Sequence, residues 1–192
     1  MPLPLPLADT DRMGIVLPLE SGGLLRDGRH VRIRPILPAD APLLVEFHER
    51  LSINTTRLRF FTALRHLSEE FATRLCNVDF KKRCAFVLSL PGDDAIRGVG
   101  RYEGESPNSA EVAFVVEDDL QGVGVGPLLL ERLVEQAREN GFTRLTAIVL
   151  GENSSMLTMF RDSAYRPEIH SEGSTAMVKL DIRKPTVAAS AG

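Results

Sequence analysis

Hydrophobic and polar positions follow a strand-like period first and a helix-like period afterwards. In "HVRIRPI" apolar and polar residues alternate, which predicts a half-buried strand. Apolar residues then recur at helical spacing in "PADAPLLVEFHERL", where Asp40 is the expected N-cap. "SINTTRLRFF" predicts a second short helix, and Ser68 is expected to cap a third in "EEFATRLCNV". One strand followed only by helices is therefore expected here.

The pattern returns to strands in the middle of the chain. "CAFVLSL", "IRGVGRYE" and "AEVAFVV" are separated by the turn sequences "PGDD" and "SPNS", which predicts an antiparallel meander. "GPLLLERLVEQAREN" then has one apolar helical face and leads into "RLTAIVL", the pattern of a strand, a helix and a parallel strand. "SSMLTMFRDSA" predicts a last helix and "TAMVKLDI" a last strand. The order β-α-α-β-β-β-α-β-α-β predicts an α/β protein with a mixed sheet.

Length and composition predict one domain with loose ends. The 192 residues are 43% hydrophobic, enough for one core. Residues 27–183 are expected to form the domain. Residues 1–26, rich in Pro, Gly and Leu, are expected to be a flexible extension, and residues 184–192 a flexible tail.

Charge, cysteines and histidines exclude several classes of function. A net charge of −3 does not favour binding to nucleic acid or to a membrane surface. The N-terminus lacks the layout of a secretory signal, and no apolar run approaches the roughly 18 residues of a membrane span. Cys76 and Cys84 lack metal-ligand spacing, which indicates a reduced, cytoplasmic protein. The four histidines are scattered and indicate no metal site.

Three alternating glycines lie where a strand is expected to end and a helix to begin. Gly122, Gly124 and Gly126 would leave the first N–H groups of that helix open, an arrangement that binds phosphate. Pro127 suits the first helical turn. The spacing is neither that of a Walker A loop nor that of a Rossmann fingerprint, although a nucleotide-binding domain for NAD stays open on the glycines alone. A tight turn without a ligand would need the same glycines.

The glutamine before these glycines makes the motif more specific. Gln121 to Gly126 matches the Q/R-x-x-G-x-G/A motif, and the chain from about Val31 to Ile182 resembles the GNAT superfamily of acetyl-CoA-dependent N-acetyltransferases. "LRFF", "HLS", "VDF" and "AEVAFVVEDDLQGVGVGPLLLERL" resemble bacterial protein lysine acetyltransferases of the Pat type. Many of those carry a cyclic-nucleotide-binding or acyl-CoA-synthetase-like domain, for which this chain is expected to be too short.

The resemblance implies a GNAT fold, with a mostly antiparallel sheet, a central parallel strand pair splayed around the cofactor, and flanking helices. It implies acetyl-CoA as the co-substrate, with the pyrophosphate on the loop and the pantetheine arm beside the preceding strand. The residues that this places at the cofactor are Phe114, Val115, Val116, Gln121, Gly122, Val123, Gly124, Val125, Gly126, Pro127, Asn153 and Phe160.

Two of these residues have open roles. Asn153 matches an asparagine that commonly contacts the cofactor, and it also fits a turn or helix cap. Phe160 stands where many members have a tyrosine that protonates the leaving thiolate, so the group that protonates the thiolate is open. Tyr165 is expected to pack in the core.

Glu111 is the candidate general base. Acetyl transfer needs an amine that loses a proton and attacks a thioester, with charge developing on the carbonyl oxygen. Glu111 is the one charged residue in "AEVAFVV", and the resemblance places the catalytic glutamate there. The alternative is a solvent-exposed glutamate near the "SPNS" turn. The acids Glu117, Asp118 and Asp119 are expected to face solvent or a lysine-bearing substrate.

The expected acceptor is a primary amine, with protein lysine, for example on acyl-CoA synthetases, favoured by the resemblance. A small amine and a non-catalytic acyl-CoA-binding module remain alternatives. Residues that select the amine are expected within 52–77, 106–109 and 167–174. In "LRFF" we expect Leu58 and Phe61 in the core and Arg57 and Arg59 in water. The protein is expected to be a monomer or a homodimer.

Overall fold

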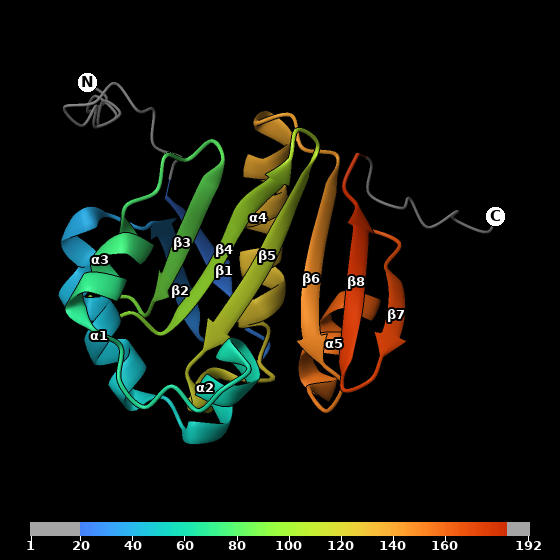
Figure 1. Cartoon of the computed structure of the whole chain (residues 1–192). Helices are drawn as coiled ribbons and strands as arrows, with labels where there is room; N and C mark the ends of the chain where they lie inside the picture. Colours follow the sequence, from blue (N-terminus) through green and yellow to red (C-terminus); the bar gives the residue numbers. More distant parts are fainter. Residues whose placement is uncertain (1–19, 184–192) are drawn as a thin grey trace, which may run out of the picture.

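One eight-stranded mixed sheet organises the chain. The computed structural model describes residues 20–183, so that 1–19 and 184–192 lie outside the described residues. The strand order is β1-β2-β3-β4-β5-β6-β8-β7, with β5 and β6 parallel and every other neighbouring pair antiparallel (Figure 1). The strands are β1 Ser21–Leu24, β2 His30–Pro35, β3 Arg83–Ser89, β4 Gly98–Ser106, β5 Ser109–Val116, β6 Arg144–Leu150, β7 Glu168–Glu172 and β8 Thr175–Asp181.

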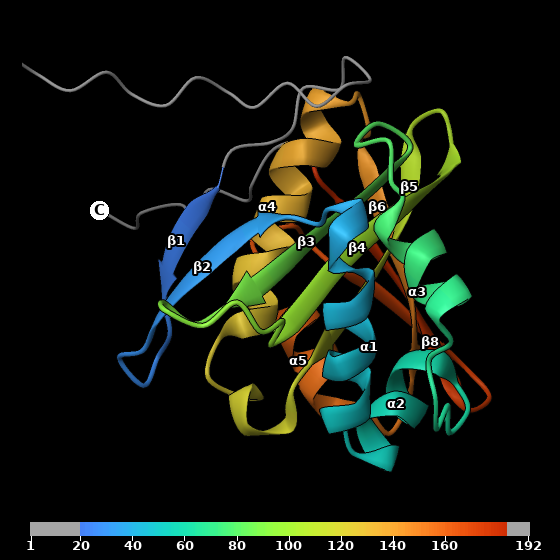
Figure 2. The ribbon, with the colours of Figure 1, turned by 90° about the vertical axis from the view of Figure 1, so that its left-hand side faces the viewer.

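Helices cover the two faces of the sheet unequally. The α-helices are α1 Ala41–Arg50, α2 Ile53–Phe60, α3 Glu69–Cys76, α4 Val125–Glu139 and α5 Ser154–Arg161. The first three lie on one face, and α4 and α5 lie on the other (Figure 2). Two short 3-10 helices, Pro38–Asp40 and Asp118–Leu120, precede α1 and the glycine loop. The expected meander and the parallel β5-α4-β6 unit are confirmed.

Two edge strands were missed from the sequence. β1 reads "SGGL" and falls inside the segment 1–26 that we expected to be an extension, and β7 reads "EIHSE". Neither sequence alternates apolar and polar residues, because an edge strand is held by hydrogen bonds to one neighbour more than by a buried face. Gly23 also lies so close to α4 that an added Cβ would be 2.8 Å from Leu128 Cδ1, which is a reason for glycine there.

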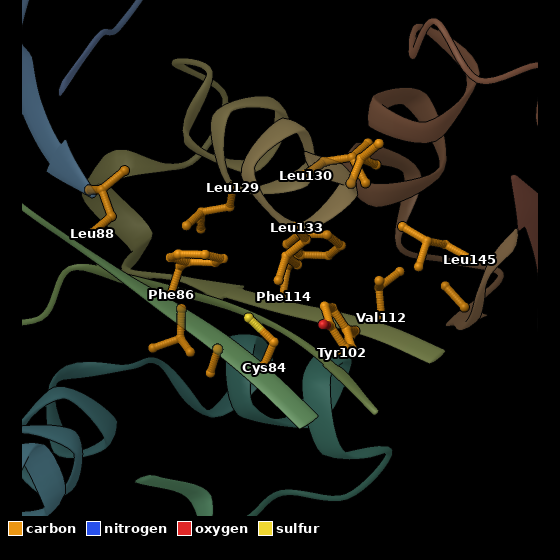
Figure 3. Close-up of a cluster of buried hydrophobic side chains, with 14 of the residues drawn as sticks. Cys84, Phe86, Leu88, Tyr102, Val112, Phe114, Leu129, Leu130, Leu133 and Leu145 are labelled. Carbon is orange, nitrogen blue, oxygen red and sulfur yellow. The ribbon is translucent and has the colours of Figure 1, made fainter. Parts of the chain in front are cut away.

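The main core lies between α4 and the sheet. The predicted apolar face of α4 is buried throughout: Leu129, Leu130, Leu133, Val134 and Ala137. Figure 3 shows Phe86 and Phe114 of the sheet beneath Leu129 and Leu133. Burying one such leucine stabilises the fold by about 1.5–3 kcal/mol. The core therefore holds β5 and the start of α4 in a constant relative position.

The two predicted N-caps have different outcomes. Ser68 Oγ accepts the N–H of Phe71 at 3.2 Å, which confirms the cap of α3. Asp40 occupies the N-cap position of α1 as expected, but its side chain does not cap that helix. Its carboxylate is instead buried in a bidentate pair with Arg34 (2.7 and 2.9 Å) and accepts the N–H of Leu37 at 2.8 Å. Asp40 thus closes the 3-10 turn before α1 and ties it to β2.

Candidate active site

The parallel strands β5 and β6 pair over only three positions. These are Ser109 with Arg144, Ala110 with Leu145, and Glu111 with Thr146. Beyond Glu111 the strands part, as Figure 1 shows, while β6 continues to pair with β8 as far as Leu150. Because β5 and β6 separate after Glu111, the β5 backbone groups that face β6 have no strand partner beyond this residue.

A cleft of about 630 Å³ opens at this parting, within the range of about 300–1,000 Å³ typical of ligand sites. Most of the expected cofactor residues line it: Phe114, Val115, Val116, Gln121, Gly122, Gly124, Val125, Gly126, Pro127 and Asn153. Val123 and Phe160 are not among the residues that line the cleft. Val123 packs against the core, and Phe160 is fully buried with its ring edge-on to Phe114 at 6.2 Å between centroids.

Backbone direction along β5 decides which groups face the cleft. The N–H of Glu117 donates to Arg97 O on the β4 side at 2.9 Å. Because backbone groups alternate in direction along a strand, the N–H and C=O groups of Phe114 and Val116 point the other way, into the cleft. Gln121 Nε2 already donates to Val116 O at 3.1 Å. With respect to the described part of the chain, residues 20–183, Phe114 therefore offers a free donor and a free acceptor, and Val116 a free donor.

The glycine loop brings the N-terminus of α4 to the same cleft. Gly122 and Gly124 have φ of 76° and 106°, which is backbone that favours glycine, and Gly124 is the residue before the first turn. A Cβ on Gly126 would be 2.6 Å from Met159 Sδ of α5, so glycine allows α4 and α5 to approach. Open amides at a helix N-terminus attract anions, which fits the expected phosphate contact.

The acidic run after β5 anchors the loop. The expectation that these acids face solvent or substrate is wrong for Glu117, which is buried, whereas Asp118 and Asp119 are exposed as expected. Glu117 is only 8% exposed and pairs with Arg50 at 2.8 Å and with Arg97 at 2.5 Å. Asp118 accepts hydrogen bonds from the N–H and Oγ of Ser52, at 3.0 and 2.6 Å. Asp119 pairs with Arg97 at 3.0 Å. These contacts fasten the entry of the loop to α1, to the start of α2 and to Arg97 before β4.

Glu111 is the last β5 residue that pairs with β6, so it stands where the cleft begins. It shares a face with Ala113 and Val115, and its side chain is exposed without lining the cleft. Partial burial raises the pKa of Glu111 above its usual value, Glu105 raises it further, and Arg59 acts in the opposite direction. A carboxylate with a raised pKa is a stronger base, which suits the expected role.

Sequence reasoning missed two arginines at the cleft. Arg59 was expected in water, but it lines the cleft from α2. The expectation that Phe61 lies in the core is also wrong, because Phe61 is 47% exposed. Phe61 ends α2 with φ of 60°, a left-handed turn that no local signal predicts. Arg26 lies beside the loop: its N–H donates to Val123 O at 2.8 Å and its side chain lines the cleft. Sequence reasoning does not find Arg26, because residues 1–26 are rich in Pro, Gly and Leu without a clear hydrophobic period.

Two contacts define the far wall of the cleft. Asn153 Oδ1 accepts the N–H of Met156 at 3.1 Å, which confirms the alternative that Asn153 caps a helix, here α5. Arg57 of α2 forms an ion pair with Glu152 in the turn after β6, so side chains bridge the two walls. Contact of Asn153 with a cofactor stays a prediction.

Neither aromatic near the end of α5 presents a proton to the cleft. Phe160 has no ionisable hydrogen, and Tyr165 is 2% exposed, as expected for a core residue. The Tyr165 hydroxyl donates to Glu131, and burial raises its pKa far above the usual value. Within residues 20–183 no group of three or more His, Cys, Asp or Glu side chains could hold a metal ion. No helix in that range is long and apolar enough to cross a membrane.

A loop of open amides, a splayed parallel pair and a free strand edge define the class of protein. The family model described as the Acetyltransferase (GNAT) family matches residues 50–164, more than half of the chain. The chain therefore belongs to the GNAT family. It is an acetyl-CoA-dependent N-acetyltransferase, and acetyl-CoA is its co-substrate.

Two acetyltransferases and one solved GNAT domain are similar to this chain over most of its length. The acetyltransferase PA5475 of Pseudomonas aeruginosa is 33% identical over 139 residues, 69% of this chain and 73% of that protein. The acetyltransferase Pat of Mycolicibacterium smegmatis is 31% identical over 134 residues, 69% of this chain and only 40% of that relative's length. The crystal structure of the GNAT domain of S. lividans PAT superposes with a TM-score of 0.77 at 33% identity, over 84% of this chain and 96% of that one.

Proposed function

We propose that this protein acetylates lysine side chains of other proteins in the cytoplasm, with Glu111 as the general base. The single observation that supports it best is the position of Glu111, at the point where β5 and β6 separate. The amide loop lies past the other end of the β5 segment that lines the cleft. A cofactor that extends from the glycine loop to the point where β5 and β6 separate would carry its acyl end toward the carboxylate of Glu111.

Binding is divided among three groups of the chain. The open amides at Gly124 and Gly126, together with the exposed Arg26, suit the phosphates of acetyl-CoA. The free N–H and C=O of Phe114 suit the amides of the pantetheine arm, which then extends the sheet as a strand would. The N–H of Val116 is the available donor for the oxygen on which negative charge develops.

The chemistry then requires one proton transfer at Glu111. The carboxylate accepts a proton from the substrate ammonium, directly or through water, and the lone pair of the resulting neutral amine forms the bond to the thioester carbon. The carbon–sulfur bond breaks and the electron pair leaves with sulfur. A thiol pKa of about 8.5 makes the thiolate a tolerable leaving group, so Phe160 in place of an acid is compatible with turnover.

Detection of acetyl-lysine by mass spectrometry, on acyl-CoA synthetases incubated with this protein and acetyl-CoA, tests the acceptor. Replacement Glu111→Gln should lower the rate by about a hundredfold to ten-thousandfold, the usual contribution of a general base. Glu103→Gln is the matched control, because Glu103 is exposed and stands directly opposite Glu111 on β4. Undiminished transfer by the Glu111 variant would exclude the role of base.

One observation favours a second candidate, a module that binds acyl-CoA without turnover. In residues 20–183 neither Phe160 nor the buried Tyr165 presents a proton to the cleft. This candidate predicts binding of acetyl-CoA by calorimetry without transfer to protein lysine or to a panel of small amines. Transfer to any member of the panel excludes it, and transfer only to small amines redirects the proposal to a small-molecule acceptor.

A further inference from the structure

A small side cavity of about 40 Å³ adjoins the cleft on the face covered by α1, α2 and α3. Most of its wall is apolar, from side chains such as Leu44, Phe47 and Val99. Arg59 and Arg101 are the charged residues in the wall, and Arg59 also lines the main cleft. The cavity therefore opens beside the segment of β5 where acyl transfer is proposed.

The two guanidinium groups are charged, largely shielded from water and without an anionic partner in contact. Within residues 20–183 neither guanidinium makes an ion pair or a hydrogen bond, and that of Arg59 lies over the ring of Phe60, 4.9 Å from its centroid. Burial and, to a smaller extent, the charge of Arg101 lower the pKa of Arg59 to about 10. Burial also lowers the pKa of Arg101. Two like charges in an apolar wall destabilise a fold unless something offsets them.

Nearby acids do not supply that partner. Glu111 and Glu103 act on Arg59 and Arg101, respectively, only through longer-range electrostatics. By contrast, Arg34 of β2 is paired bidentately with Asp40. The arginines at the cavity are thus unlike the paired arginine on β2.

His48, the remaining polar residue of the wall, is not available. Its Nε2 is 2.8 Å from Leu64 O, and its ring packs edge-on to Phe60. Among the side chains of the wall, Arg59 and Arg101 therefore supply the remaining hydrogen-bond donors. Planar guanidinium groups bind carboxylates with two parallel hydrogen bonds.

We infer that Arg59 and Arg101 form a carboxylate-binding subsite next to the acyl-transfer site. The cavity volume of about 40 Å³ exceeds the roughly 10–15 Å³ that one water molecule needs by the same measure, so it admits a group the size of a carboxylate. The carboxylate is carried either by the far end of the acyl group or by the acceptor beside its reacting amine. The biological role of this subsite depends on the proposed acyl transfer. Its ability to bind a carboxylate does not.

Calorimetric binding separates the two sources without requiring turnover. The donor arm compares succinyl-CoA with butyryl-CoA, which has the same chain length without the carboxylate. The acceptor arm compares a lysine–glutamate peptide with a lysine–glutamine peptide in the presence of coenzyme A. Each arm is measured for the native protein, Arg101→Met, Arg59→Gln and the control Arg74→Met, an exposed arginine on α3.

The native protein should prefer the carboxylate-bearing ligand in one arm by about tenfold to a hundredfold, the range for charge-assisted hydrogen bonds. That preference should fall to about threefold or less in Arg101→Met and in Arg59→Gln, and persist in Arg74→Met. Thermal unfolding of Arg101→Met should occur at the same or a higher temperature, because the variant removes an unpaired shielded charge. A merely structural arginine would lower it.

Absence of a preference in both arms of the native protein, or a preference that survives in both cavity variants, overturns the subsite. Absence of acyl transfer from acetyl-CoA to every amine tested would refute the proposed function alone, because the binding ratios are measured independently.

Discussion

Replacing Glu117 by glutamine should destabilise the segment between β5 and the glycine loop. Glu117 is 8% exposed and holds Arg50 and Arg97 at 2.8 and 2.5 Å, immediately after β5. Removing one member of a buried ion pair costs about 3–5 kcal/mol, because the remaining charges lose their partner. The side chains of Arg50 and Arg97 are 35% and 20% exposed, so water offsets part of this loss. We expect a loss of about 2–3 kcal/mol in the free energy of unfolding.

Circular dichroism on heating measures this loss. For a chain of this size, the unfolding midpoint of Glu117→Gln should fall by roughly 4–12 °C. Acetyl-CoA binding should weaken as well, since the open amides of the loop lose their fixed position. Asp119→Asn is the control: its carboxylate also contacts Arg97 but is 56% exposed, so its effect should be below about 0.5 kcal/mol. Equal effects of the two substitutions would refute the reasoning from burial.

Three further predictions concern the cofactor loop, the phosphates and the base. Gly124→Ala should lower the free energy of unfolding by about 1–3 kcal/mol in urea titrations, because the φ of 106° strains any residue with a Cβ; unchanged stability would contradict this. Arg26→Gln should raise the KM for acetyl-CoA about tenfold with little change in kcat, an effect that should shrink in high salt if Arg26 meets a phosphate. The pKa of Glu111 is raised above 4.5 and the base must be ionised, so kcat/KM should fall as pH decreases through a value above 4.5. This acid limb should be absent from the residual activity of Glu111→Gln, and its persistence would assign it to another group.

Periodicity predicted the elements whose stability depends on one buried face. The apolar stripe of α4, the meander and the cap at Ser68 were predicted because each depends on residues a few positions apart. The glycine motif likewise placed a helix N-terminus after β5. Periodicity did not predict β1 and β7. These edge strands have little apolar alternation and are held mainly by hydrogen bonds to one neighbouring strand.

Long-range pairing decided the partners of the charged side chains. The sequence could not show that Glu117 meets Arg50, which is 67 positions away, or that Arg59 turns toward the sheet while Phe61 is exposed. A charge next to a loop has the same local pattern whether it anchors the loop or faces a substrate. Only the packing of α1 and α2 against β4 and β5 distinguishes these cases.

The sequence alone therefore determined the class of protein and the order of its main elements, through a short motif and local periodicity. The tertiary structure decided where β5 and β6 separate, which backbone groups of β5 face the cleft, and which arginines line it. The physical reason is that the hydrophobic period and helix caps act between residues close in the chain. The parting of two strands and the pairing of charges depend on segments that only the folded sheet brings together.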